Sequence, residues 1–172
     1  VEPVALVALL PGVMAVDKKL PVKNVADFVA LAKAQPGKFD YATSGIGSLG
    51  HLGPELFKKE TGTNLVAIPY QSGAQVTQAM LSGNVQMFFA TVPPVLPFKD
   101  KVHILAISHN KRLTALPDVL TFAEQGLPGI DVQLWEGVFA PKGTDQTIVD
   151  KMNKEINAVI QMPEVRERIA KL

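Results

Sequence analysis

The stretch that decides the fold of this chain is Phe39-Asp40-Tyr41-Ala42-Thr43-Ser44-Gly45-Ile46-Gly47-Ser48-Leu49-Gly50-His51. It begins with a short strand pattern at residues 39–43 and passes through a turn rich in glycine and serine. Residues 51–61 then have a helical pattern, which Gly62 ends. A strand that leads through a short loop into a helix is the repeating unit of α/β proteins, so this stretch predicts an α/β fold.

The same alternation continues in both directions along the chain. Further strands are expected at residues 4–16, 65–70, 85–90, 102–108 and 132–140. Helices are expected at residues 25–35, 74–81 and 122–125, after a cap at Thr144 or Asp145, and at 164–171. Strands that alternate with helices favour a largely parallel sheet. The run 4–16 lacks strict alternation, so we expect a strand buried on both faces, as in parallel sheets, which Pro11-Gly12 could divide.

Composition excludes several classes of function. The 172 residues are 47% apolar and 19% charged, with a formal net charge of +1. Such a balance gives no general attraction to nucleic acid or to a membrane surface, and no basic run interleaves with aromatic residues. The absence of cysteine excludes disulfides, thiolate catalysis and metal sites with Cys ligands. The longest apolar run, 4–16, is shorter than the roughly 20 residues of a membrane span.

The first candidate site is the loop Thr43–His51, between an expected strand and an expected helix. Its glycines let the backbone approach a ligand, and its serine hydroxyls and free N–H groups at the helix start favour an anion. A tight turn with a capping serine explains the same pattern equally well. A dinucleotide site is disfavoured, because the glycines fall at 45, 47 and 50 and no acidic residue ends the next strand.

Three other segments carry possible ligand contacts. Tyr70, in the loop before the next expected helix, could offer its ring and hydroxyl to a ligand or simply anchor the turn. Thr91 directly follows the expected strand 85–90, in a position for a hydrogen bond, whereas the phenylalanines before it fit a core. Trp135 fits either the core or the edge of a cleft. His51 could donate to an anion or lie on a helix surface.

No signature of catalysis stands out. Ser44 and Ser48 lack the flanking pattern of a nucleophile elbow, and no P-loop, zinc-protease motif or pair of carboxylates appears. We therefore expect a binding protein and not an enzyme. A small α/β enzyme that uses Ser44–Ser48 to hold a phosphate is the alternative.

Several segments together resemble the Bug-type receptors of tripartite tricarboxylate transporters. The resemblance extends in order over almost the whole chain through the segments 39–52, 68–73, 116–119, 137–144 and 163–166. It implies a type II periplasmic-binding-protein fold, with two α/β lobes of mixed, mostly parallel sheets that close around a ligand. Lobe two would span residues 16–102, and residues 1–15 and 103–172 would belong to, or bridge to, an incomplete lobe one.

The resemblance also implies a function. The chain would capture a small carboxylate in the periplasm, without a cofactor, and deliver it to membrane permease subunits; a sensor for a signalling partner is the alternative. The implied ligand-binding residues come from four segments. They are Thr43, Ser44, Gly45, Gly47, Ser48, His51, Tyr70, Gly73, Ala90, Thr91 and Trp135.

Two departures from the family pattern carry expectations of their own. The strand end that usually reads Phe-Asp-Asn is Phe89-Ala90-Thr91 here, so the loss of an acidic group favours a plain carboxylate or a less polar compound over an amino acid. The sequence begins at Val1, almost inside a strand and without a signal peptide or the family's first Gly-rich loop. We therefore expect a fragment that binds weakly and self-associates through uncovered apolar surface.

Overall fold

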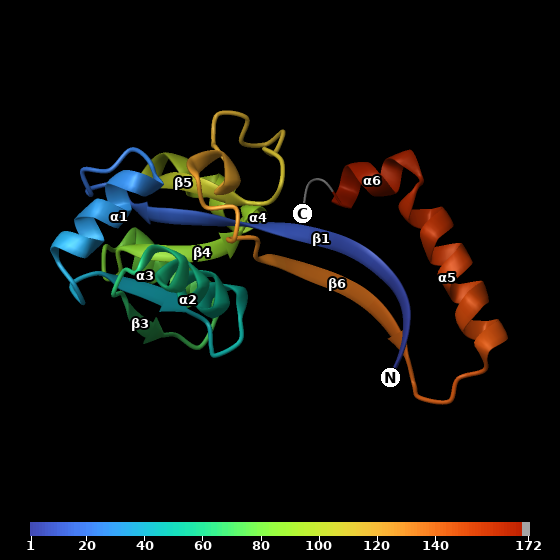
Figure 1. Cartoon of the computed structure of the whole chain (residues 1–172). Coiled ribbons are helices and arrows are strands. Elements are labelled where there is room, and N and C mark those ends of the chain that lie inside the picture. The colour runs from blue at the N-terminus through green and yellow to red at the C-terminus, as the bar shows by residue number, and fades with distance from the viewer. Residues whose placement is uncertain (170–172) are drawn as a thin grey trace. The chain divides into compact units, whose positions relative to one another are not determined.

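The computed structural model describes residues 1–169, and it divides into two compact units (Figure 1). The larger unit is Pro11–Gln133, and the smaller unit joins Val1–Leu10 to the residues from Leu134 onward. The range 16–102 expected for lobe two lies inside the larger unit. That unit continues to Gln133 because the segment around Thr121 pairs with the edge of the sheet at Ile107. The assignment of residues to lobes stays a prediction.

The sheet of the larger unit has the strand order β3-β2-β4-β1-β5. The strands are β1 (Glu2–Asp17), β2 (Asp40–Thr43), β3 (Val66–Pro69), β4 (Met87–Thr91) and β5 (Val102–Ser108). β2 runs parallel to β3 and β4, whereas β1 runs antiparallel to both of its neighbours, β4 and β5. Four strands therefore share one direction and β1 opposes them, which confirms a mixed, mostly parallel α/β sheet.

The parallel pairing expected for β1 is wrong. Val13–Val16 are fully buried between β4 and β5, so this part of the strand is covered on both faces. A strand that is buried on both faces shows no apolar–polar alternation, whether its neighbours run parallel or antiparallel to it. The sequence pattern therefore could not reveal the direction of the strands next to β1. Pro11 and Gly12 do not divide the strand, which is continuous from Glu2 to Asp17.

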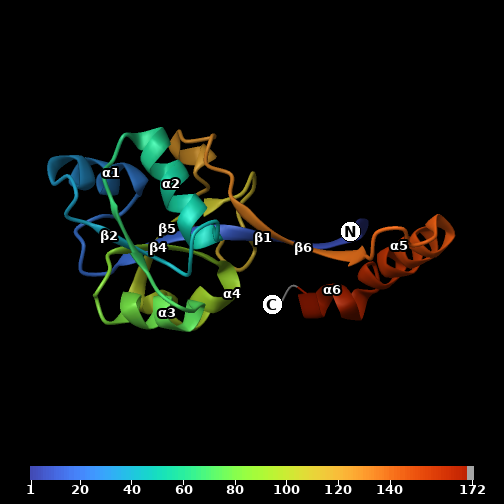
Figure 2. The same cartoon turned by 90° about the horizontal axis from the view of Figure 1, so that it is seen from below.

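Helices cover both faces of this sheet, and Figure 2 shows α1 and α2 on one side and α3 and α4 on the other. The helical elements of the larger unit are α1 (Val25–Ala34), α2 (Leu49–Thr61), α3 (Gly73–Leu81), α4 (Val92–Val95), η1 (Leu96–Lys101) and η2 (Ala123–Gln125). One core contains Phe28, Phe57 and Phe122. The other core contains Val76 and Phe98 on the opposite face.

Local interactions set the ends of these helices. Asn24 caps α1 by accepting a hydrogen bond of 2.8 Å from the Asp27 backbone N–H. Gly62 ends α2 in the left-handed conformation at φ 66°. Thr121 and Glu124 form a reciprocal capping box before η2. The Thr121 N–H donates to the Glu124 carboxylate at 2.8 Å, and the Glu124 N–H donates to the Thr121 hydroxyl at 3.1 Å.

The smaller unit is built from the first part of β1, the strand β6 (Gln133–Ala140) that pairs with it, α5 (Gln146–Ile160) and α6 (Pro163–Ile169). Its core is small, with Val4, Ala140 and Val149 as the buried apolar residues. Asp145 caps α5 through the Thr147 N–H at 2.8 Å. The last two residues of the helix expected at 164–171 lie outside the described residues. Within residues 1–169, no helix is long and apolar enough to cross a membrane.

Candidate functional site

The parallel strands bring three of the predicted segments to one edge of the sheet. Thr43 is in register with Pro69, and the Tyr70 N–H donates to the Thr43 carbonyl at 2.8 Å. β4 lies on the other side of β2 and ends at Thr91, which pairs with Gly12 of β1. We call residues 43–50, 70–73 and 90–92 the carboxyl edge. Such an edge is the usual place for ligands in open α/β sheets.

The loop after β2 is closed by its own hydroxyl groups. Thr43 is 3% exposed, and its hydroxyl donates to the Gly45 carbonyl at 3.1 Å and accepts from the Gly45 N–H at 3.2 Å. The Ser48 hydroxyl donates to the same carbonyl at 2.7 Å. Ser48 is the N-cap residue of α2, but its side chain makes no capping hydrogen bond to the helix. The two hydroxyls instead organise the loop, and neither of them points outward freely.

Other groups of this loop remain on its outer side. The exposed Ser44 hydroxyl takes part in no hydrogen bond among residues 1–169. Gly45 and Gly47 have φ values of 134° and 84°, conformations that residues with a Cβ rarely adopt. Between them, the side chain of Ile46 is 94% exposed. The loop thus presents one hydroxyl, glycine backbone and one apolar side chain to the outside.

His51 lies against the same loop, because its Nδ1 accepts a hydrogen bond of 3.4 Å from the Gly47 N–H. The ring is half-buried on the first turn of α2. With Nδ1 acting as the acceptor, Nε2 is the nitrogen that carries the proton. His51 therefore supports the loop through one nitrogen and has a donor on the other.

A close approach between α2 and β4 fixes the position of the helix start. A Cβ at Gly53 would lie 2.4 Å from Cδ1 of Phe89, which leaves no room for any side chain there. Phe89 in turn stacks on Phe122, with ring centroids 5.8 Å apart and planes 6° from parallel. Sequence reasoning did not single out Gly53, although a glycine within a helical pattern is a signal for close packing.

The second loop is also held by side-chain caps. Ser72 caps α3 by accepting from the Gln75 N–H at 3.3 Å, and the Gln71 N–H donates to the Gln75 side chain at 2.9 Å. Tyr70 is half-buried against the core on the α3 face and lines a hollow of about 350 Å³ beside that helix. Tyr70 thus anchors the turn, whereas Gly73 has open space around it.

The end of β4 completes the edge with uncharged groups. Ala90 and Thr91 are both half-buried, and Thr91 precedes α4 without capping it through its side chain. On the other side of β1, β5 ends at Ser108, a residue whose structural role the sequence did not indicate. The fully buried Ser108 hydroxyl donates to the Ile130 carbonyl at 3.3 Å and accepts from the Val132 N–H. No spacing pattern marks a buried structural serine of this kind.

The carboxyl edge contains no lysine, arginine, aspartate or glutamate. An ionic cluster lies in the middle of α2, where Glu55 accepts from Tyr41 at 2.6 Å and from Lys58 at 2.7 Å. The hydrogen bonds from Lys58 and Tyr41 lower the pKa of Glu55, and burial together with Glu55 raises the pKa of Tyr41. The negative charge of Glu55 is therefore compensated within the fold by Lys58. Among residues 1–169, no group of three His, Asp or Glu side chains could hold a metal ion.

Trp135 belongs to the smaller unit and is not buried core. Its side chain is 56% exposed on β6, and its ring lies 6.0 Å from that of Phe139 at an angle of 60°. Both rings flank Gly137, where a Cβ would lie 3.2–3.3 Å from each of them. The contribution of Trp135 to ligand binding stays a prediction.

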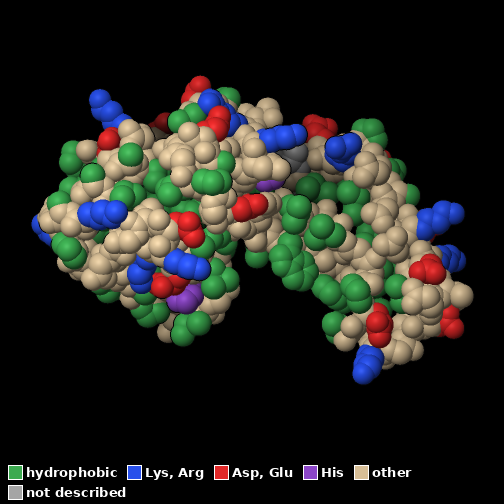
Figure 3. Space-filling model, viewed as in Figure 1, with side chains coloured by type: hydrophobic (Ala, Val, Ile, Leu, Met, Phe, Trp, Pro, Cys, Tyr) green, Lys and Arg blue, Asp and Glu red, His purple; other side chains and the backbone are tan. Residues whose placement is uncertain are grey.

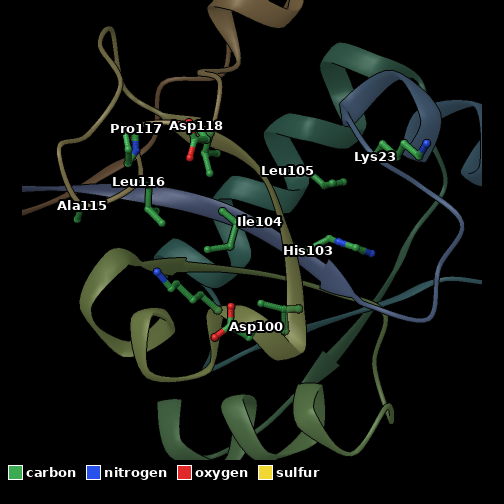
Figure 4. Close-up of a pocket in the computed structure, with 12 residues that line it drawn as sticks. Lys23, Asp100, His103, Ile104, Leu105, Ala115, Leu116, Pro117 and Asp118 are labelled. Atoms are coloured by element: carbon green, nitrogen blue, oxygen red, sulfur yellow. The ribbon is translucent and has the colours of Figure 1, made fainter.

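A separate hollow of about 320 Å³ lies along the outer edge of β5 (Figure 4). His103, Ile104 and Leu105 of the strand line it, together with Leu116–Val119 from the following loop and the side chains of Lys23, Lys99 and Asp100. It includes none of the predicted ligand-binding residues.

The whole chain, residues 1–172, matches the family described as the tripartite tricarboxylate transporter family receptor, TctC. Protein BugT of Bordetella pertussis is 35% identical over 170 residues, which are 98% of this chain and 52% of BugT. The solved structure of R. palustris Rpa4515 with adipate is 33% identical with a TM-score of 0.88, covering 99% of this chain and 57% of that one.

A further solved structure is MatC from Rhodopseudomonas palustris with bound malate. It is 28% identical with a TM-score of 0.85, covering 98% of this chain and 58% of MatC. This chain thus spans about half the length of the curated relatives it matches. These matches agree with the α/β sheet and with the order of motifs along the chain, and the chain belongs to the tripartite tricarboxylate transporter receptor family.

Proposed function

We propose that this chain takes part in capturing a small carboxylate in the periplasm for a tripartite tricarboxylate-type transporter. The observation that carries the proposal is the uncharged carboxyl edge, with an ordered glycine–serine loop at the start of α2, in a chain of this receptor family. Structural neighbours were solved with adipate and with malate, both of which are dicarboxylates. Another neighbour is described as the periplasmic binding protein BugD.

Neutral donors would hold the carboxylate. The Ser44 hydroxyl, which has no partner among residues 1–169, is the first of them. The backbone around Gly45 and Gly47 and the N–H groups at the start of α2 would add donors, because the helix dipole favours negative charge there. Gly73 and Thr91 would contribute from the two neighbouring strand ends.

Thr43 and Ser48 would act on the ligand indirectly. Their hydroxyls bind the Gly45 carbonyl and so keep this acceptor away from an approaching carboxylate. Ala90, in place of an acidic residue, gives the site no group to pair with an amine. The ligand class that fits is therefore a carboxylate without an amino group.

The partners would be the membrane subunits of the transporter. A second copy of this chain is a further partner, because the smaller unit buries few apolar residues and exposes many, as the hydrophobic side chains on its surface show (Figure 3). Exposed apolar surface of this extent favours association in water.

The test is a titration of the ¹⁵N-labelled chain with adipate and with malate, followed by NMR. We expect shifts confined to the amides of 44–47, 73 and 91, and about a 10-fold weaker affinity in Ser44→Ala, since a hydrogen bond to a charged group contributes roughly 1.5–3 kcal/mol. Ser82→Ala, at the other end of α3, is the matched control and should bind like the unmodified chain. The proposal fails if neither acid perturbs these amides.

A further inference from the structure

Ile46 is the most exposed large apolar side chain of the larger unit, at 94%. A single exposed apolar residue is ordinary on a protein surface. This one, however, stands at the centre of the loop that the proposed function assigns to the carboxylate. Every other residue of 43–48 is Thr, Ser or Gly.

The backbone on both sides of Ile46 is held in place. Before it, Gly45 binds the Thr43 hydroxyl through its N–H, and its carbonyl accepts from the Ser48 hydroxyl at 2.7 Å and from the Ser48 N–H at 3.2 Å. After it, the Gly47 N–H donates to His51. These hydrogen bonds fix the backbone on both sides of Ile46, whose side chain is exposed. The loop therefore keeps an apolar group in solvent at a fixed place.

The residues around Ile46 indicate which ligands its side chain would favour. The carboxyl edge has no charged side chain, and Ala90, the last residue but one of β4, offers no polar side-chain group to a ligand. A ligand held by its carboxylate at Ser44 and the glycine backbone would place its next atoms beside Ile46. Burial of methylene groups against Ile46 is favourable, whereas a hydroxyl or amino group there would lose water without gaining a partner.

We infer that Ile46 selects carboxylates with an extended apolar chain over shorter or more polar ones. The inference rests on the proposed function, because it concerns the same site. Each methylene that is removed from water changes Kd by about 4-fold. Adipate has two more methylenes than succinate and the same two carboxylates. We therefore expect adipate to bind about 16-fold more tightly than succinate to the unmodified chain.

The experiment compares the Kd values of adipate and succinate, measured by NMR titration, in the unmodified chain and in the variants Ile46→Ser and Ile46→Val. Ile46→Ser should reduce the adipate preference to about 3-fold or less with little change in succinate affinity, and Ile46→Val should retain most of the preference. Val66→Ser, a matched apolar-to-serine change at the amino end of β3, should leave the preference intact. Unfolding curves confirm that each variant is folded.

The outcomes separate the two claims. If Ile46→Ser weakens both acids equally, or leaves their ratio unchanged, the selective role of Ile46 is wrong while carboxylate binding stands. If neither acid binds the unmodified chain, the proposed function itself fails, and the role of Ile46 fails with it.

Discussion

The hydroxyl oxygens of Thr43 and Ser48 lie 3.2 Å apart, and both groups donate to the carbonyl of Gly45. Thr43 ends β2 and Ser48 precedes α2, so this pair closes the loop between strand and helix. Because a buried donor or acceptor without a partner is costly, the two hydroxyls and the carbonyl that they share are held in one arrangement.

Removing either hydroxyl should therefore destabilise the chain. Thr43→Val and Ser48→Ala should each cost about 1 kcal/mol in the free energy of unfolding, measured with urea. The double variant should cost less than the sum of the two by about 0.5 kcal/mol or more, because the groups share a partner. Ser44→Ala, next to them but without a hydrogen bond, should stay within about 0.5 kcal/mol. Additive effects would contradict the shared network.

Gly53 should not tolerate even alanine. A Cβ there meets the Phe89 ring at 2.4 Å, and overpacking of this kind costs about 1–3 kcal/mol, more than the gain of up to about 1 kcal/mol in helix propensity. Urea unfolding of Gly53→Ala should show this loss, and Phe89→Leu in the same chain should recover part of it. Gly73→Ala, at the start of α3 with open space around it, should be neutral or slightly stabilising. Equal stability of the two alanine variants would refute the contact.

The ionisation of Glu124 makes the free energy of unfolding depend on pH in the acid range. Hydrogen bonds from Arg112 and from the Thr121 backbone lower its pKa from 4.5 to about 2. Since the folded pKa lies below the unfolded value, the stabilisation is present above about pH 4.5 and is lost as the pH falls toward 2. The stability difference between the unmodified chain and Glu124→Gln should shrink over this interval. Glu155→Gln, at an exposed position of α5, controls for the loss of one charge, and a difference that is independent of pH would oppose the prediction.

The smaller unit should drive self-association. Among the described residues, ten of the fourteen exposed large hydrophobic side chains belong to it, including Trp135 at 56% and Phe139 at 45%. The mass measured by light scattering should therefore rise with protein concentration. Replacing Trp135 and Phe139 together by serine should lower the association, whereas Leu81→Ser in the larger unit should not. A concentration-independent monomer would rule this surface out.

The sequence predicted most elements because their signals are local. Asn24 with Asp27 marks one helix end through a bond between residues three apart, and Gly62 marks another through a single backbone conformation. The candidate loop was visible for the same reason, since a glycine–serine run between a strand and a helix is a local pattern. These features depend on neighbours along the chain, which a single sequence contains.

Long-range contacts decided the rest. The antiparallel direction of β1 depends on β4 and β5, more than 70 positions away, and burial on both faces hides direction from any periodicity. The bond of the Ser48 hydroxyl to Gly45 spans only three residues, but a serine before a helix can equally use its hydroxyl as a helix cap, so the local pattern did not decide between the two. Gly53 is required only because the ring of Phe89 occupies the space beside it.

The sequence by itself therefore determined that this chain is an α/β protein whose strand–loop–helix unit at 39–51 suits an anion, and its ordered motifs indicated the receptor family. Tertiary structure decided which groups of that loop are available. In the folded loop, the hydroxyls of Thr43 and Ser48 bind the Gly45 carbonyl, whereas the side chains of Ser44 and Ile46 are exposed. The reason is that a hydroxyl binds whichever partner the fold brings within about 3 Å.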